Sequence, residues 1–122
     1  MRRFRFDAAV GHAITQFGSQ RAIITGIQRT SGPVHIACMH IGPSGGVGYH
    51  QATTRQLFLV VTGVGWVTGA DRAQRPIAAG EAAYWDTGEW HESGSARGMT
   101  VIVIEGDDLQ PDQLLRETSF LE

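Results

Sequence analysis

His50, Gln56 and His91 are the residues whose side-chain types and spacing could do chemistry in this sequence. His50 and Gln56 lie six positions apart in one glycine-bounded block, "GGVGYHQATTRQLFLVVTG", and His91 lies in a second block, "TGEWHESG". Side chains an even number of residues apart share one face of a regular strand, so His50 and Gln56 are expected to project together. Imidazoles with a pKa of about 6.5 can exchange protons, and an amide both donates and accepts hydrogen bonds. The three residues could therefore form a polar pocket for a small molecule.

The elements that must position these side chains are short β-strands. The sequence has 16 glycines, which separate short runs rich in β-branched and aromatic residues, the pattern of many strands joined by tight turns. One helical segment is expected at 110–117, because Pro111 suits a first helical turn and Asp112 suits its dipole. This pattern predicts an all-β antiparallel sandwich or barrel with a short C-terminal helical segment. The predicted strands are 21–28, 34–41, 56–62, 64–68, 75–78, 81–86 and 99–105.

The predicted strand 34–41 carries one histidine on each face. Strict alternation places His35 with the odd-numbered residues and His40 with the even-numbered ones. If this strand lines a barrel, one of the two imidazoles must point inward, and the alternation leaves open which one. The inward histidine is an alternative third imidazole for the pocket.

Bulk composition limits the partners and the compartment. A chain of 122 residues with 42% hydrophobic residues is expected to form one domain, and its net charge of −2 argues against nucleic acid or an anionic membrane. Cys38 is the single cysteine, so no intramolecular disulfide can form and a reducing cytoplasmic location is expected. The longest apolar runs, "LFLVV" and "VIVI", are too short to span a bilayer.

The two blocks resemble the paired motifs of the cupin superfamily, over 44–63 and 80–95. His50 matches the first histidine of the family, Ala52 stands in place of the second, Gln56 in place of the glutamate, and His91 matches the histidine of the second motif. The resemblance implies a single domain over 1–122, folded as a jelly-roll or double-stranded β-helix barrel, and a homodimer. It also implies one divalent transition metal (Fe, Mn, Ni, Zn or Cu) held by His50, Gln56 and His91.

Three functions follow from this resemblance. The first is a metal-dependent small-molecule enzyme of dioxygenase, isomerase or lyase type, with the metal bound by the three pocket residues. The second is a metal-free module that binds or senses a small molecule in the same pocket. The third is a metal-free isomerase or cyclase in which a pocket histidine is the acid or base. Ala52 argues against the first and is neutral toward the others, because a methyl group cannot ligate a metal.

Overall fold

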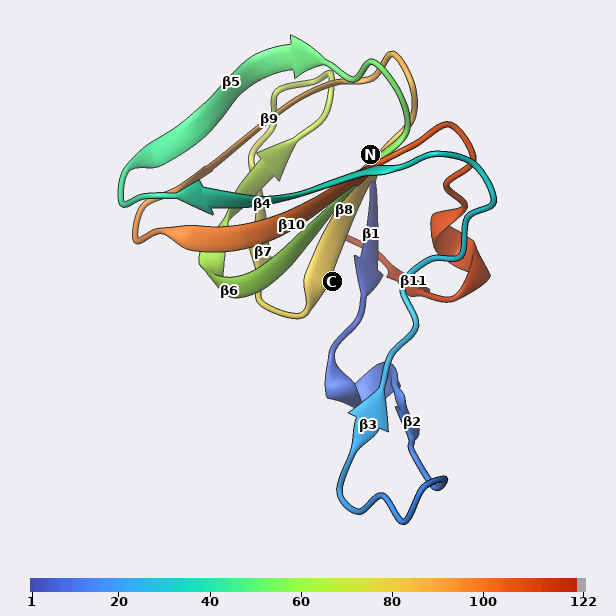
Figure 1. Ribbon diagram of the computed structural model, residues 1–122. Helices are drawn as coiled ribbons and strands as arrows, with labels where there is room; N and C mark the ends of the chain where they lie inside the picture. The colour runs from blue at the N-terminus through green and yellow to red at the C-terminus, as the bar shows by residue number, and fades with distance from the viewer. Residues whose placement is uncertain (121–122) are drawn as a thin grey trace.

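The computed structural model describes residues 1–120, which form a barrel of two antiparallel sheets that share one strand (Figure 1). The larger sheet has the order β11 (Arg116–Thr118), β1 (Arg2–Arg5), β8 (Glu81–Trp85), β6 (Gln56–Thr68), β10 (Met99–Glu105) and β4 (His35–Ile41). The smaller sheet consists of β5 (Gly45–Gln51), β9 (Trp90–Ser95), the second half of β6, and β7 (Arg75–Ala78). The described residues contain no α-helix, and the predicted all-β antiparallel barrel is confirmed.

Strand β6 joins the two sheets, and this differs from the sequence prediction. The predicted strands 56–62 and 64–68 form one continuous strand, so the turn expected at Gly63 is absent. Gly63 instead has a φ of 90°, and the pairing of β6 with β10 shifts register between Thr100 and Val101. A glycine allows this backbone conformation without a Cβ clash, so the strand can change direction without ending.

The core lies on both faces of the larger sheet. Alternate residues of β6, such as Phe58 and Val60, point into the barrel, whereas Leu57 and Leu59 point outward under the C-terminal segment. A strand covered on both faces reads as a continuous apolar run, which explains "LFLVV". The inner cluster contains Ile41, Phe58, Val60, Val67, Ile77, Ala83, Trp85, Met99, Val101 and Val103. The outer cluster contains Phe4, Leu57, Leu59, Ala82, Tyr84, Leu109 and Leu115.

The predicted helical segment at 110–117 is much shorter than expected. Only Pro111–Gln113 forms a 3-10 turn, and the chain continues as strand β11. The cause is tertiary pairing, because β11 pairs antiparallel with β1 and places Arg3 opposite Thr118. Local helical signals were therefore overridden by a strand near the other end of the chain.

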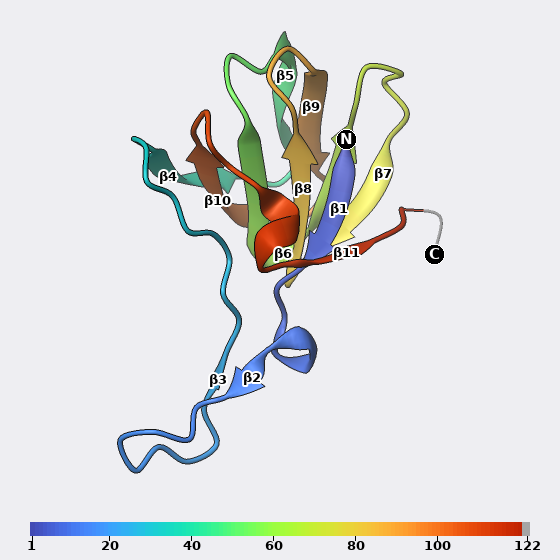
Figure 2. The same cartoon turned by 90° about the vertical axis from the view of Figure 1, so that its right-hand side faces the viewer.

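Residues 21–28 were predicted as a strand, but only β3 (Ile23–Ile24) is extended and paired. Within residues 1–120 it pairs with β2 (His12–Ala13) alone, and β2 follows the 3-10 turn η1 (Ala8–Val10). The two strands form a hairpin that projects away from the barrel (Figures 1 and 2). Strands β1, β2, β5, β9 and β11 are absent from the predicted set, and in β5 and β9 the reason is that their glycines and polar residues resemble turns. None of the helical segments in residues 1–120 has the length and apolarity needed to span a membrane.

The bend in β6 generates a test of the fold. A Cβ at Gly63 would lie 2.4 Å from the Gly98 carbonyl oxygen and 2.8 Å from the Met99 Cα. We expect Gly63→Ala to lower the free energy of unfolding by roughly 2–4 kcal/mol, since backbone strain and a backbone clash add together. Urea denaturation followed by circular dichroism measures this loss. Gly42→Ala is the control, because no heavy atom lies within 4 Å of that Cβ position, and an equal loss in both variants would contradict the role of Gly63.

Candidate functional site

His50 and His91 face each other across the β5–β9 pair. They are direct register partners, and their ring centroids lie 4.3 Å apart with the planes tilted by 55°. The register shifts between Val47 and His50, so β5 carries a bulge just before the first histidine. Bulges redirect side chains near functional sites, and here the bulge precedes the residue that faces His91.

His91 is a buried imidazole with one unsatisfied nitrogen. Its side chain is 3% exposed and stacks on Trp85 with ring centroids 4.3 Å apart. Nδ1 lies 3.3 Å from the Glu89 carbonyl oxygen, which can only accept, so Nδ1 carries the proton. Nε2 therefore presents a lone pair, and it is buried with no hydrogen-bond partner among the described residues. An unpartnered buried polar atom of this kind costs about 1–3 kcal/mol unless something binds it.

Burial favours the neutral form of His91. Burial lowers the pKa of the imidazole below its ordinary value, and the neighbouring His50 acts in the same direction, while the Glu89 carbonyl and carboxylate oppose them. His50 has the same tautomer, because its Nδ1 donates to the Gly48 carbonyl at 2.6 Å. Both imidazoles are thus oriented by a backbone carbonyl through Nδ1, which leaves both Nε2 atoms as acceptors.

Gln56 lines the same cavity as the two histidines. It is the first residue of β6, is 9% exposed, and pairs with Trp85 on one side and Glu105 on the other. The cavity has a volume of about 90 Å³. The structure thus brings together all three residues singled out by the sequence. His50 and Gln56 lie on the separate strands β5 and β6, however, and not on one face of a single strand as predicted. Among the described residues, the cavity is lined by Met39, Val47, His50, Gln56, Phe58, His91, Ser93, Val103 and Glu105.

Glu105 is a pocket residue that sequence reasoning missed. It is the last residue of β10, where Val101 and Val103 point into the barrel, so it continues their inward face. Alternation along "VIVIE" was the signal that could have identified it. The carboxylate of Glu105 makes no hydrogen bond or ion pair within residues 1–120 and forms part of the cavity lining. No three His, Cys, Asp or Glu side chains of residues 1–120 lie close enough to hold a metal ion together.

Ala52 and the histidines of β4 lie outside this lining. Ala52 is buried, and its backbone pairs with Glu89 and Gly88 in the loop that leads to His91. The inner face of β4 carries Ile41 and Met39, so His35 is on the inward side, but it lies at the exposed start of the strand and lines a neighbouring surface pocket. His40 points outward, beside the exposed thiol of Cys38 at 3.6 Å. Neither His35 nor His40 lines the cavity.

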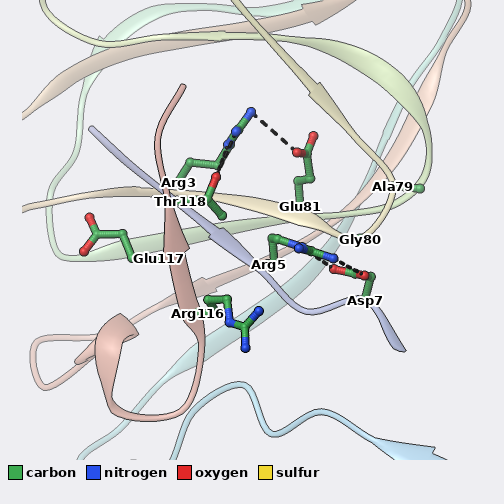
Figure 3. A pocket seen from close by; sticks show the side chains of 9 residues that line it. All are labelled: Arg3, Arg5, Asp7, Ala79, Gly80, Glu81, Arg116, Glu117 and Thr118. Carbon is green, nitrogen blue, oxygen red and sulfur yellow. Dashed lines mark hydrogen bonds and ion pairs between the residues drawn. The ribbon is translucent and has the colours of Figure 1, made fainter. Parts of the chain in front are cut away.

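A larger cleft of about 660 Å³ lies beside β1, β8 and β11, away from the histidines (Figure 3). Most of its charges are paired: Arg5 forms a bidentate pair with Asp7 at 2.9 and 2.8 Å, and Arg3 lies 3.5 Å from Glu81. Arg3 also donates to Thr118, so the network joins the two terminal strands. Because most of the charges that line the cleft already have partners, we place no site there.

The comparisons with known proteins bear on the fold. No family model and no curated protein matches the chain. Solved structures do: a cupin superfamily protein from Desulfitobacterium hafniense is 13% identical, with a TM-score of 0.58, covering 74% of this chain and 82% of that one. A Cupin 2 conserved barrel domain protein from Salinispora arenicola is 20% identical, with a TM-score of 0.57 and coverages of 65% and 67%.

A third solved structure gives the same result. An RmlC-like cupin with a double-stranded β-helix fold from Methanocaldococcus jannaschii is 10% identical, with a TM-score of 0.57, covering 70% of this chain and 75% of that one. At these identities the likeness shows the architecture and not the activity. The chain has the fold of the cupin superfamily, the double-stranded β-helix barrel.

Proposed function

We propose that this cupin-fold protein binds a divalent transition metal between His50, His91 and Gln56, and uses it to bind a small oxygen-bearing molecule. The observation that carries the proposal is the buried Nε2 atom of His91, which has a free lone pair and no partner among the described residues. The Nε2 atom of His50, the neighbouring imidazole, is a second acceptor. Two neutral imidazoles and an amide oxygen fit Zn, Ni, Cu or Fe better than Mg or Ca.

The orientation of both imidazoles supports this proposal. Metal-bound histidines almost always donate their other ring N–H to a carboxylate, a carbonyl or water, and both histidines here donate to backbone carbonyls. The lowered pKa of His91 keeps its lone pair available near neutral pH. A metal bound here would supply a Lewis acid that polarises an oxygen of the small molecule.

The size of the cavity limits the second ligand. About 90 Å³ is far smaller than the roughly 300–1,000 Å³ of drug-sized sites. Since a water molecule takes about 30 Å³ of liquid volume, the space accommodates an ion with a few waters or a molecule of a few non-hydrogen atoms. The proposed substrate is therefore a molecule of few non-hydrogen atoms.

The second candidate function is metal-free binding of a small molecule. Its support is the acceptor-rich lining, in which the two Nε2 atoms and Glu105 accept hydrogen bonds without an added cation. Gln56 is neutral, so it gives a divalent ion less charge stabilisation than a glutamate would. A ligand of this site would carry hydroxyl or ammonium donors.

Calorimetric titration of chelator-treated protein with Zn²⁺ and Ni²⁺ separates the two candidates. All variants carry Cys38→Ser, which removes the exposed thiol beside His40. We expect one ion per chain, at least tenfold weaker binding in His50→Ala and in His91→Ala, and unchanged binding in His12→Ala, whose imidazole is exposed on the hairpin. Absence of binding in the parent protein, or binding insensitive to both pocket variants, would exclude the metal site and leave the metal-free candidate.

Gln56→Glu tests the role of charge in the same cavity. An anionic oxygen in place of a neutral amide should strengthen Zn²⁺ binding at least tenfold, about 1.4 kcal/mol. Gln74→Glu adds the same charge in an exposed loop and should leave the affinity unchanged. Equal gains in the two variants would point to long-range charge attraction and not to ligation by residue 56.

The pKa of His91 predicts a pH dependence of stability. Unfolded histidine titrates at about pH 6.5, whereas the folded His91 stays neutral to lower pH. Below pH 6.5 the unfolded state binds more protons, so the free energy of unfolding should fall as the pH decreases from 6.5 toward the folded pKa. Urea denaturation at pH 7.5 and 5.5 should show a larger loss for the parent protein than for His91→Gln. Equal losses would show that other groups, shared by both proteins, account for the effect.

A further inference from the structure

We call residues 12–25 the hairpin arm. No strand of the barrel within residues 1–120 pairs with it. In the described part of the chain its two strands pair only with each other, through His12–Ile24 and Ala13–Ile23. Figures 1 and 2, which differ by a quarter turn, both show the arm extending away from the barrel. A free two-stranded hairpin is at best marginally stable in water. The arm therefore needs a surface to pack against.

The tip of the arm presents an aromatic side chain in an unfavourable conformation. Phe17 and Gly18 have φ values of 62° and 68°, and the Ser19 N–H donates to the Gln16 carbonyl at 3.0 Å, which makes a type I′ turn. Such turns favour Asn-Gly, and a bulky residue in the left-handed region costs roughly 1–2 kcal/mol. Phe17 is also 95% exposed. Packing within the described chain explains neither the strain nor the exposure.

Two further apolar side chains flank the tip. Ile23 is 54% exposed and Ile24 is 57% exposed. With Phe17 they make an aromatic anchor with aliphatic neighbours on one short arm. Aromatic anchors surrounded by weaker contacts are typical of protein interfaces.

We infer that the arm docks on a second copy of this chain, and that each protomer's Phe17 packs on the acceptor surface of the other. We define the acceptor surface as Pro33, Val34, Glu105 and Asp107, which line a surface pocket of about 350 Å³. Strand β4 begins beside this pocket and pairs with β10 alone within residues 1–120, so its other edge is open.

Charge complementarity favours this surface. Arg21 is the one Asp, Glu, Lys or Arg residue in the arm. The acceptor surface carries two carboxylates, Glu105 and Asp107, beside Pro33 and Val34. A basic, apolar arm thus meets an acidic, apolar surface.

The area required by a stable interface favours a second copy over a single docked partner. Ile23 and Ile24 are neighbours on one strand and project from opposite faces of the arm, so Phe17 and one isoleucine can be buried on one surface. They bury on the order of 300 Å², which with an equal acceptor area gives about 600 Å², below the roughly 1,000 Å² of a specific interface. Two arms exchanged about a two-fold axis give about 1,200 Å², within the range of specific, stable interfaces.

The docked arm would lie next to the candidate site. Glu105 lines both the acceptor pocket and the His50–His91 cavity. Each protomer would therefore place an aromatic side chain at the rim of its partner's cavity. The interface itself does not depend on what the cavity binds.

Phe17→Asn tests the arm without endangering the fold. Asn suits the first central position of a type I′ turn, so this variant should keep or improve the turn while removing the aromatic ring. Sedimentation equilibrium should show a dimer for the parent protein and at least a tenfold larger dissociation constant for Phe17→Asn. Val64→Thr, which removes exposed apolar surface on β6, is the matched control and should leave the dimer unchanged. A monomeric parent protein, or a dimer that Phe17→Asn does not weaken, would overturn the proposal.

Disulfide trapping tests the acceptor surface. Phe17→Cys and Val34→Cys are made in separate chains, each with Cys38→Ser, and are then mixed under oxidising conditions. The expected product is a disulfide-linked heterodimer, at a yield several-fold above that from Phe17→Cys mixed with Val64→Cys. Equal yields from the two mixtures would overturn the assignment of the acceptor surface.

Discussion

Strand β6 belongs to both sheets, and the barrel exists because its backbone changes direction at Gly63 without breaking the strand. Its first half pairs with β8 and β10, and its second half pairs with β7 and β9. The φ of 90° at Gly63 and the contact with the Gly98 carbonyl leave no room for a side chain. The position of β9, and so of His91, follows from this bend, while Gln56 enters the cavity as the first residue of the same strand.

The candidate site is continuous with the hydrophobic core. His91 stacks on Trp85, whose indole belongs to the inner cluster and donates to the Thr68 carbonyl at 3.1 Å. The protein thus holds a neutral imidazole in apolar surroundings, with its remaining lone pair unpaired. A rigid core of this kind preorganises a binding atom, since the ring has a packed face and a fixed tautomer. Binding at Nε2 would offset the desolvation of that nitrogen.

Two regions of the surface differ in whether their side chains have partners: the cleft beside β1 and β11, and the arm with the open edge of β4. Beside the charged cleft, the terminal strands β1 and β11 are joined by polar contacts such as Arg2–Glu117 and Arg3–Thr118. The arm and the open edge of β4 instead expose Phe17, Ile23 and Ile36. Paired charges need no further partner, whereas strained and exposed apolar groups do. This contrast is why the arm, and not the larger cleft, carries the inferred interface.

Local sequence was sufficient for the type of fold and for three residues of the cavity. Glycine spacing and β-branched runs predicted an antiparallel β protein, because strand periodicity and turn geometry are properties of neighbouring residues. His50, Gln56 and His91 line one cavity as expected. The prediction that His50 and Gln56 share a face of one strand was wrong, because β5 ends at Gln51 and β6 begins at Gln56, so the packing of two strands brings them together.

Tertiary structure decided the rest. Alternation along β4 could not say whether His35 or His40 faced inward, because that depends on which face the inner cluster covers. Residues 116–118 form a strand and not part of a helix, because β11 pairs with β1. Gly63 lies within a continuous strand and not in a turn, because β6 pairs with β10 before it and with β7 after it. Glu105 lines the cavity because β10 pairs with β6, which places Glu105 opposite Gln56. The sequence by itself determined which side chains share a face of a strand, and the packing of the sheets determined which face lies inside, because burial depends on partners far away in the chain.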